Sequence, residues 1–169
     1  RDASTTEEVY MEVIRGKTAM LFEASTHSAA ALAEATDEQR EALRTFGDHL
    51  GVAFQLVDDL LDYKGDSQTL GKNVGDDLAE GKPTLPLIYT MREGTAEQAA
   101  LVRQAIQKGG LEDLEQIRVA VEESGALKYT AELARDYVKR AIACLEVLPA
   151  SEYRDALVEL SEFAVARTH

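Results

Sequence analysis

Residues 51–63 constrain the fold most strongly, because they are apolar apart from one glutamine and three aspartates. At about 100° per residue these four polar residues fall within an arc of roughly 100° on one helix face; they are Gln55, Asp58, Asp59 and Asp62. Packing three like charges together in a buried helix is costly unless a cation neutralises them or water reaches them. The segment therefore predicts a largely buried helix that presents a cluster of carboxylates.

The type of ligand in this cluster indicates which metal it would bind. Asp58, Asp59 and Asp62 supply only oxygen, and no histidine or cysteine lies beside them in the sequence. Such ligands favour Mg2+, which keeps several waters and usually shares its remaining positions with substrate phosphates. The alternative is an exposed helix end with solvated carboxylates. We prefer the metal site, because Asp is a poor residue for a helix interior and the surrounding apolar residues leave little polar face.

Composition limits the class of protein and its partners. The 169 residues are 45% hydrophobic, which is enough for the core of one domain. A net charge of -13, from 31 acidic and 18 basic residues, argues against a nucleic-acid partner. The single cysteine excludes an intramolecular disulfide framework and fits a cytoplasmic location. No apolar run approaches the roughly 18 residues of a membrane span, and the start at Arg1 indicates a fragment.

Helical periodicity extends over nearly the whole chain, and no alternation typical of strands is present. We therefore expect one all-α domain over residues 1–169. Capping boxes at residues 4–8 begin a helix that should continue to about Thr36. Asp37 is a good N-cap for a second helix, which should end near Tyr63. A glycine-rich loop follows over residues 64–86, with at most a short helical turn. Further helices are expected at about 84–92, 95–108, 111–123, 126–147 and 152–167.

Lys17 is unusual because it falls within the predicted apolar stripe of the first helix, between Tyr10 and Leu21. Its stem could simply pack while its ammonium reaches water, and the neighbouring Thr18 could bond back to the preceding turn. The aspartates on the next helix favour another interpretation. A lysine that faces a metal-bound diphosphate would act as a compact point charge on phosphate oxygens.

Two more lysines lie beside glycines in the loop, Lys72 in Gly-Lys-Asn-Val-Gly and Lys82 in Glu-Gly-Lys-Pro-Thr. Backbone and ammonium groups could close on an anion there, although the spacing is not that of a Walker-type phosphate loop. The alternative is a solvated connector. Asp76, Asp77 and Glu80 in the same loop are better explained by helix capping and solvent exposure than by metal binding.

These motifs together resemble the trans-prenyl diphosphate synthases, and in particular long-chain bacterial members such as the octaprenyl diphosphate synthases. The resemblance rests on residue types, order and spacing along nearly the whole chain. The matching elements are Gly16-Lys17-Thr18, then Phe54-Gln55-x-x-Asp58-Asp59-x-x-Asp62, then Gly71-Lys72-x-x-Gly75-Asp76-Asp77-Leu78-x-x-Gly81-Lys82.

The resemblance implies an antiparallel helical bundle of the isoprenoid synthase type, homodimeric in the family, of which this chain would hold only the C-terminal helices. Asp58, Asp59 and Asp62 would bind Mg2+. Lys17, Thr18 and Lys72 would contact an allylic diphosphate, and Gln55 would lie beside the reacting chain. Lys82 would close the active-site lid over the diphosphate. On this basis the catalytic residues are Lys17, Thr18 and Gln55, and the diphosphate-binding residues are Lys17, Thr18, Gln55, Lys72 and Lys82.

The reaction that the resemblance implies begins when an allylic diphosphate ionises. The double bond of isopentenyl diphosphate then attacks, a proton is lost, and repeated cycles give a long chain for respiratory quinones. The family's first aspartate-rich motif and its paired arginines normally precede the Lys-Thr motif and are absent here. We therefore expect the 169 residues alone to be inactive.

Two other functions remain open. A terpene cyclase or similar enzyme would share the all-α architecture and a metal-bound diphosphate, but the Phe-Gln and Gly-Lys elements argue against it. A noncatalytic partner subunit of a synthase is the second alternative. It would have no need for an assembled set of lysines and aspartates.

Overall fold

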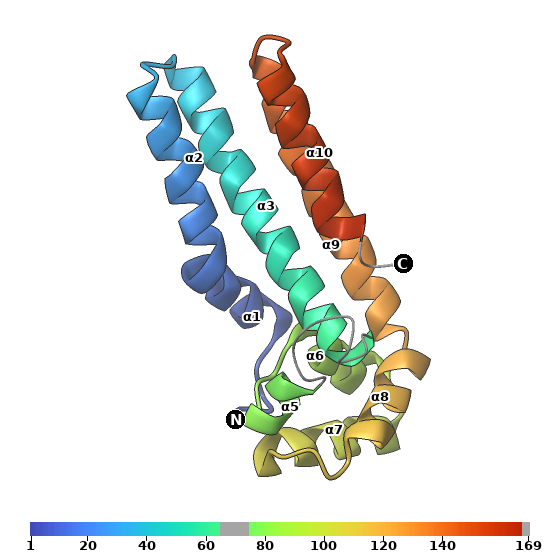
Figure 1. Ribbon diagram of the computed structural model, residues 1–169. Helices are drawn as coiled ribbons and strands as arrows, with labels where there is room; N and C mark the ends of the chain where they lie inside the picture. The colour runs from blue at the N-terminus through green and yellow to red at the C-terminus, as the bar shows by residue number, and fades with distance from the viewer. Residues whose placement is uncertain (65–74, 167–169) are drawn as a thin grey trace. The chain divides into compact units, whose positions relative to one another are not determined.

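The computed structural model describes residues 1–64 and 75–166, and within these residues it contains helices and no strand. This confirms the all-α prediction (Figure 1). In chain order the elements are α1 (Glu7–Ile14), the π-helical turn η1 (Arg15–Ala19), α2 (Met20–Leu32), α3 (Asp37–Lys64), α5 (Asp76–Glu80), α6 (Leu85–Glu93), α7 (Ala96–Lys108), α8 (Leu114–Glu123), α9 (Ala126–Cys144), the 3-10 turn η2 (Leu145–Val147) and α10 (Glu152–Ala166).

The chain divides into two compact units. The first contains Arg1–Tyr10 and Asp58–Ala131, and the second contains Met11–Val57 and Glu132–His169. Helix α3 therefore contributes its last turns to the first unit and the rest of its length to the second. The single domain expected over residues 1–169 stays a prediction.

The second unit is built from long helices, and Figure 1 shows α2, α3 and α10 running beside one another. Phe46 and Leu50 of α3 are at most 5% exposed and belong to the same apolar cluster as Ala141 and Leu145. These positions recur every three or four residues, as expected for helices that bury one face. Partly buried apolar residues pack against this cluster: Phe22, Leu43, Cys144, Leu148, Leu157, Val158 and Ala164.

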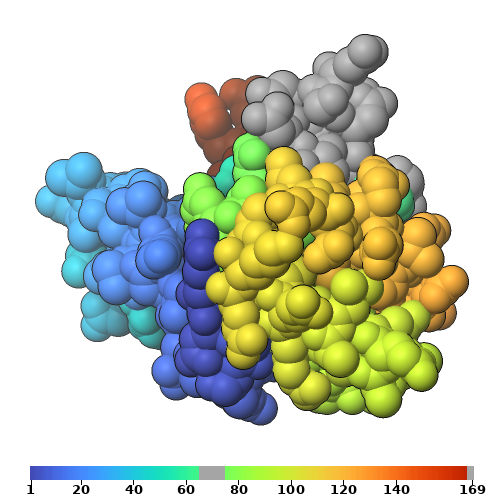
Figure 2. Space-filling view, turned by 90° about the horizontal axis from the view of Figure 1, so that it is seen from below, coloured from blue at the N-terminus to red at the C-terminus, as the bar shows by residue number. Residues whose placement is uncertain are grey.

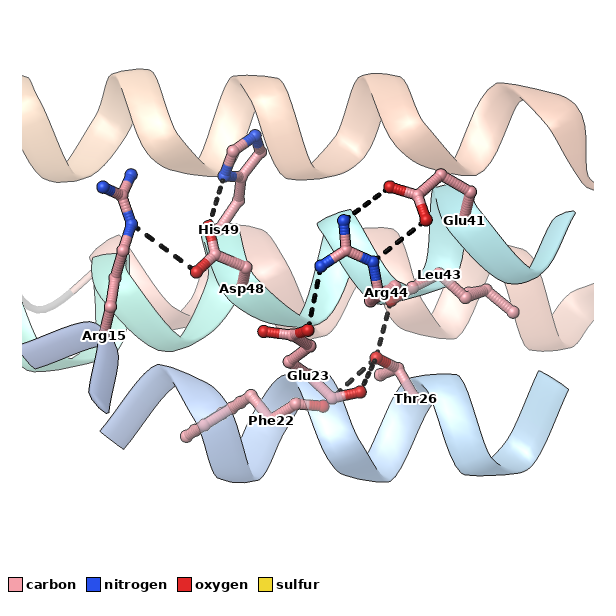
Figure 3. A network of polar contacts seen from close by, with 9 residues as sticks. All are labelled: Arg15, Phe22, Glu23, Thr26, Glu41, Leu43, Arg44, Asp48 and His49. Carbon is pink, nitrogen blue, oxygen red and sulfur yellow. Dashed lines mark hydrogen bonds and ion pairs between the residues drawn. The ribbon is translucent and has the colours of Figure 1, made fainter. Parts of the chain in front are cut away.

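Polar contacts join α2 to α3 along this unit (Figure 3). The guanidinium of Arg44 lies 2.9 Å from a carboxylate oxygen of Glu23. The Thr26 hydroxyl donates a hydrogen bond to the backbone carbonyl of Leu43, with 2.6 Å between the oxygens. Because a side chain of one helix bonds the backbone of the other, the two helices must approach closely at this point.

The first predicted helix differs from the structure in two ways. It ends at Leu32 instead of Thr36, and a π-helical turn interrupts it. The backbone N–H of Met20 donates to the carbonyl of Arg15, a separation of five residues instead of the four of an α-helix. The turn holds one extra residue, so the side chains that follow it are rotated relative to a regular helix.

This rotation explains why the predicted apolar stripe is wrong after the π turn, although Val13, which lies before the turn and was also placed in the stripe, is 45% exposed. Buried positions run from Tyr10 to Ile14 and then, five residues later, to Ala19. Leu21, which the regular helical pattern placed in the stripe, is 70% exposed. Lys17 is also exposed and lies outside the buried face. Lys17 is therefore not a lysine within an apolar stripe, and its side chain need not pack its methylene stem against the core.

The first unit packs the shorter helices α5 to α8 around the end of α3. Tyr63, the penultimate residue of α3, is 2% exposed, and the backbone carbonyl of Tyr63 accepts a hydrogen bond from Arg118 Nε at 3.0 Å. Gly75 adopts a left-handed conformation with φ of 87° at the start of α5, which favours glycine. The apolar cluster contains Tyr63, Leu78, Leu87, Val102, Ala105, Ile106, Ile117, Val121 and Ala126.

The start of the chain is anchored within the same unit, and Figure 2 shows it lying beside α7. Arg1 donates hydrogen bonds to the backbone carbonyls of Glu80 and Lys108. Glu7 accepts hydrogen bonds from Arg92 of α6 at 2.7 Å and from the Tyr129 hydroxyl at 2.8 Å. These contacts fix where α1 begins, and therefore where Tyr10 points.

The remaining helices agree with the sequence pattern apart from their ends. Helix α8 begins at Leu114 instead of residue 111, and α9 gives way to a 3-10 turn after Cys144. Cys144 is half-buried and packs against the apolar cluster of the second unit. In the residues that the structure describes, no helix has the length and apolar character needed to cross a membrane.

Candidate functional site

The predicted acidic cluster lies on the last turns of α3, where two of its members are buried. Asp59 is 3% exposed and Asp62 is 0% exposed, whereas Asp58 is half-buried. Asp59 and Asp62 are therefore not the solvated carboxylates of an exposed helix end, and that alternative is wrong for them. A buried carboxylate requires hydrogen-bond donors or a cation.

Asp59 receives a hydrogen bond from a residue that the sequence pattern placed only in the core. The Tyr10 hydroxyl donates to Asp59 Oδ2 at 2.6 Å, and Tyr10 is 4% exposed. Burial, and then the adjacent Asp59 charge, raise the pKa of Tyr10 well above its ordinary value, so its phenol stays protonated and can donate. The sequence did contain a signal for this contact: a tyrosine in a predicted buried stripe indicates that its hydroxyl has a hydrogen-bond partner nearby.

Asp62 connects α3 to the start of α5. Its Oδ2 accepts a hydrogen bond from the backbone N–H of Asp77 at 3.2 Å, and its backbone carbonyl accepts one from Gly75 at 3.1 Å. A carboxylate that bonds the N-terminal N–H groups of a helix satisfies donors that otherwise have no partner within that helix. Asp62 therefore has a structural role in addition to any metal role. Asp77, expected to be exposed, has a side chain that is only 15% exposed.

Lys82 is held by carboxylates of its own segment. Its ammonium lies 2.8 Å from Glu80 and 3.1 Å from Asp77. The hydrogen bond to Glu80 is the main cause of the raised pKa of Lys82. In this arrangement Lys82 is fully charged, and it would have to exchange these partners for phosphate oxygens to act on a diphosphate. The other loop lysine, Lys72, lies outside the described residues.

The donor chemistry of the aspartates fits Mg2+, which commonly binds through one or two carboxylates and completes its shell with water and phosphate. Residues 1–64 and 75–166 contain no ready-made group of three His, Cys, Asp or Glu side chains able to hold a metal. This agrees with Asp59 and Asp62 engaging protein donors. Asp58 is the most accessible of the three, and it fits the role of direct ligand best.

Lys17, Thr18 and Gln55 belong to the second unit, where the structure brings Thr18 and Gln55 together. The Thr18 hydroxyl donates a hydrogen bond to Gln55 Oε1, with 2.8 Å between the oxygens. Lys17 precedes Thr18 in the π turn and is exposed. Turns of this kind occur frequently at functional sites. Two motifs recognised separately in the sequence are thus in direct contact.

A cavity of about 740 Å³ in the first unit is not part of this site. It is lined by the first eight residues and by side chains of α6 and α7, among them Arg92 and Arg103. Among the residues that the structure describes, none of those predicted from the sequence for metal or diphosphate binding lines it.

Comparison with known proteins assigns the family. A family model described as polyprenyl synthetase matches residues 1–124, which is more than half of the chain. The chain belongs to the polyprenyl synthetase family. This confirms the resemblance drawn from the Lys-Thr, Phe-Gln and Asp-Asp motifs.

Relatives within the polyprenyl synthetase family include enzymes that make long products. The chain is 48% identical to an octaprenyl diphosphate synthase of Haemophilus influenzae, covering 99% of this chain and 51% of that protein. It is 52% identical to an all-trans-nonaprenyl-diphosphate synthase of Rhodobacter capsulatus, covering 96% and 50%. The chain thus spans about half the length of the curated relatives that it matches.

A solved polyprenyl synthase confirms the fold. The crystal structure from Caulobacter crescentus, complexed with calcium and isoprenyl diphosphate, matches with a TM-score of 0.93 and 43% identity. The match covers 99% of this chain and 52% of that one. The helices described above therefore have the arrangement found in part of a polyprenyl synthase.

Proposed function

We propose that this chain is the C-terminal part of a Mg2+-dependent trans-polyprenyl diphosphate synthase. The intact protein would extend an allylic diphosphate with isopentenyl diphosphate to a long-chain product, and an octaprenyl chain for quinone side chains fits best. Family membership and the similarity to octaprenyl and nonaprenyl diphosphate synthases support this.

The hydrogen bond between Thr18 and Gln55 is the observation that carries the proposal. These residues are 37 positions apart, and the bond joins the Lys-Thr element to the Phe-Gln element of α3. A bundle that needed only structural packing could place an apolar pair here. Instead it places a hydroxyl and an amide, next to an exposed lysine. The contact orients the Gln55 amide by engaging its oxygen.

The proposed roles follow from charge and accessibility. The Lys17 ammonium is exposed and would bind oxygens of the allylic diphosphate, stabilising the negative charge that grows as the diphosphate departs. Thr18 would fix the amide of Gln55 beside the reacting chain. Lys72 and Lys82 would add positive charge to the diphosphate, after Lys82 has released Asp77 and Glu80. No side-chain nucleophile is required for this chemistry.

Asp58, Asp59 and Asp62 are the proposed metal-binding residues, with Asp58 as the direct ligand. Bound Mg2+ would neutralise the diphosphate and make it a better leaving group. Asp59 and Asp62 would hold the end of α3 through Tyr10 and the start of α5. The calcium and isoprenyl diphosphate in the structure of the Caulobacter crescentus relative support a site of this chemistry.

Three further expectations concern the protein as a whole. Because the chain spans about half of its relatives, we propose that the 169 residues alone do not catalyse prenyl transfer. The likeness to the family also supports a homodimer and a cytoplasmic location for the intact protein.

Product analysis of the intact protein tests the proposal. It would be incubated with an allylic diphosphate and labelled isopentenyl diphosphate, with Mg2+ or with a chelator, and the prenyl chains separated by length. We expect long linear products only when Mg2+ is present, and none from the 169-residue chain. Cyclised hydrocarbons would instead indicate a terpene cyclase. Activity that appears only after a second subunit is added would indicate a noncatalytic partner.

A further inference from the structure

Helix α3 lies close to the preceding helical segment at two of its glycines, Gly47 and Gly51, and Gly51 lies against the π turn. A β-carbon added at Gly51 would lie 2.5 Å from the Cα of Ala19 and 3.0 Å from its Cβ. Carbon atoms in ordinary contact are about 3.5 to 4.0 Å apart. Any side chain at residue 51 would therefore push the backbone of the π turn away from α3 by about 1 Å.

The contact between Gly51 and Ala19 is adjacent to the contact between Thr18 and Gln55. Ala19 is the last residue of the π turn and follows Thr18 directly. Gln55 lies four residues after Gly51, one turn further along α3, and so on the same side of the helix. The Thr18 hydroxyl can reach Gln55 Oε1 at 2.8 Å because the next residue touches the bare backbone of α3.

We propose that Gly51 is a positioning residue: the absence of a side chain there sets the distance between the π turn and α3, and thereby places Thr18, with its neighbour Lys17, against Gln55. Nothing in the sequence pattern indicates this role, because a glycine inside a helix usually only weakens it. The kinetic consequence rests on the function proposed above. The geometric consequence does not.

The chain offers two matched controls. Gly47 also packs against α2, and a β-carbon there would lie 2.4 Å from Thr26 Oγ1 and 2.6 Å from the carbonyl oxygen of Phe22. Gly47 lies one turn further from Gln55 along α3 and faces Thr26. Gly47→Ala therefore disturbs the same pair of helices away from the π turn. Gly16 lies inside the π turn but has nothing within 4 Å of an added β-carbon, so Gly16→Ala tests a substitution without a clash.

The experiment compares these variants in the intact protein, with Thr18→Val as a further variant that removes the hydroxyl and keeps the Gly51 contact. We expect Gly51→Ala to lower kcat/KM for the allylic diphosphate by about 100-fold, the typical cost of a displacement of about 1 Å in a site. Thr18→Val should also lower kcat/KM, without lowering the melting temperature as Gly51→Ala does. Gly47→Ala should lower the melting temperature while kcat/KM stays within about twofold of wild type. Gly16→Ala, whose added β-carbon meets no atom, should not lower the melting temperature.

A crystal structure of Gly51→Ala provides the second measurement, and it needs no activity. We expect the Thr18 Oγ1 to Gln55 Oε1 distance to exceed 3.5 Å, beyond hydrogen-bond range. An intact Thr18–Gln55 bond in that variant would overturn the proposal. Equal losses of kcat/KM in Gly51→Ala and Gly47→Ala would also overturn it, because they would indicate a general loss of packing. If the wild-type protein transfers no prenyl group, the proposed function fails, and the distance alone decides the role of Gly51.

Discussion

The hydrogen bond between Tyr10 and Asp59 is buried at both ends, so its contribution to the free energy of unfolding can be worked out from the structure. Its oxygens are 2.6 Å apart, Tyr10 is 4% exposed and Asp59 is 3% exposed, so water does not compete for either group. A hydrogen bond to a charged partner contributes about 1.5 to 3 kcal/mol to stability. We therefore expect Tyr10→Phe, which removes only the hydroxyl, to lower the free energy of unfolding by about this amount.

Urea denaturation of wild type and Tyr10→Phe measures the effect as a lower midpoint with an unchanged m-value. Tyr153→Phe is the matched control, because Tyr153 is 77% exposed and its hydroxyl should contribute less than about 0.5 kcal/mol. The effect of removing the hydroxyl should also depend on the charged carboxylate of Asp59. In an Asp59→Asn background, Tyr10→Phe should cost clearly less than in the wild type.

Two results would refute this reasoning. If Tyr10→Phe stays within about 0.5 kcal/mol of wild type, the hydroxyl does not stabilise the buried carboxylate. If the loss is as large in the Asp59→Asn background, the contribution of the Tyr10 hydroxyl does not depend on the negative charge of Asp59.

Two further predictions concern charged groups outside the candidate site. Burial lowers the pKa of His49 more than the neighbouring Asp48 raises it. As the pH falls below about 6.5, the His49 imidazole therefore binds a proton more readily in the unfolded chain than in the folded chain. The free energy of unfolding should therefore decrease from pH 7 towards pH 5, and His49→Gln should make this decrease smaller; a steeper decrease would contradict the assignment. Arg92 pairs with Glu7 and lies over two tyrosine rings. Arg92→Met should therefore lower the free energy of unfolding by about 1 kcal/mol in urea denaturation. Arg103→Met, at an exposed arginine of α7, should lower it clearly less.

Helix positions were largely predictable from the sequence, because apolar spacing and caps are local signals. Helix α3 ends at Lys64, one residue beyond the expected end. Asp37 was expected to cap this helix but is its first residue, and the Thr36 hydroxyl caps it by accepting a hydrogen bond from the backbone N–H of Gln39. The register of the first helix was not predictable in the same way. The π turn inserts a residue between the buried positions Ile14 and Ala19, and a regular helical pattern assumes that no such insertion exists. Lys17 was therefore singled out for the wrong reason, although it does lie in the turn that contacts α3.

The candidate site was predictable in its residue types but not in its contacts. The arc of Gln55, Asp58, Asp59 and Asp62 follows from helix geometry alone, and the structure confirms that Asp59 and Asp62 are buried. The partners of these residues come from distant parts of the chain. Tyr10 lies 49 residues from Asp59, and the backbone of Asp77 reaches Asp62 from another helix. Periodicity carries no information about such tertiary pairs.

The dependence of prenyl transfer on Mg2+ concentration, measured for the intact protein and for Asp58→Asn, tests the central claim most directly. Wild type should be inactive without a divalent cation, and Asp58→Asn should need at least about tenfold more Mg2+ to reach half of its maximal rate. Glu162→Gln, an exposed acidic residue on α10, should leave the Mg2+ dependence unchanged. Superimposable Mg2+ curves for wild type and Asp58→Asn, or full activity in a chelator, would contradict the claim that the end of α3 holds the metal of a diphosphate site.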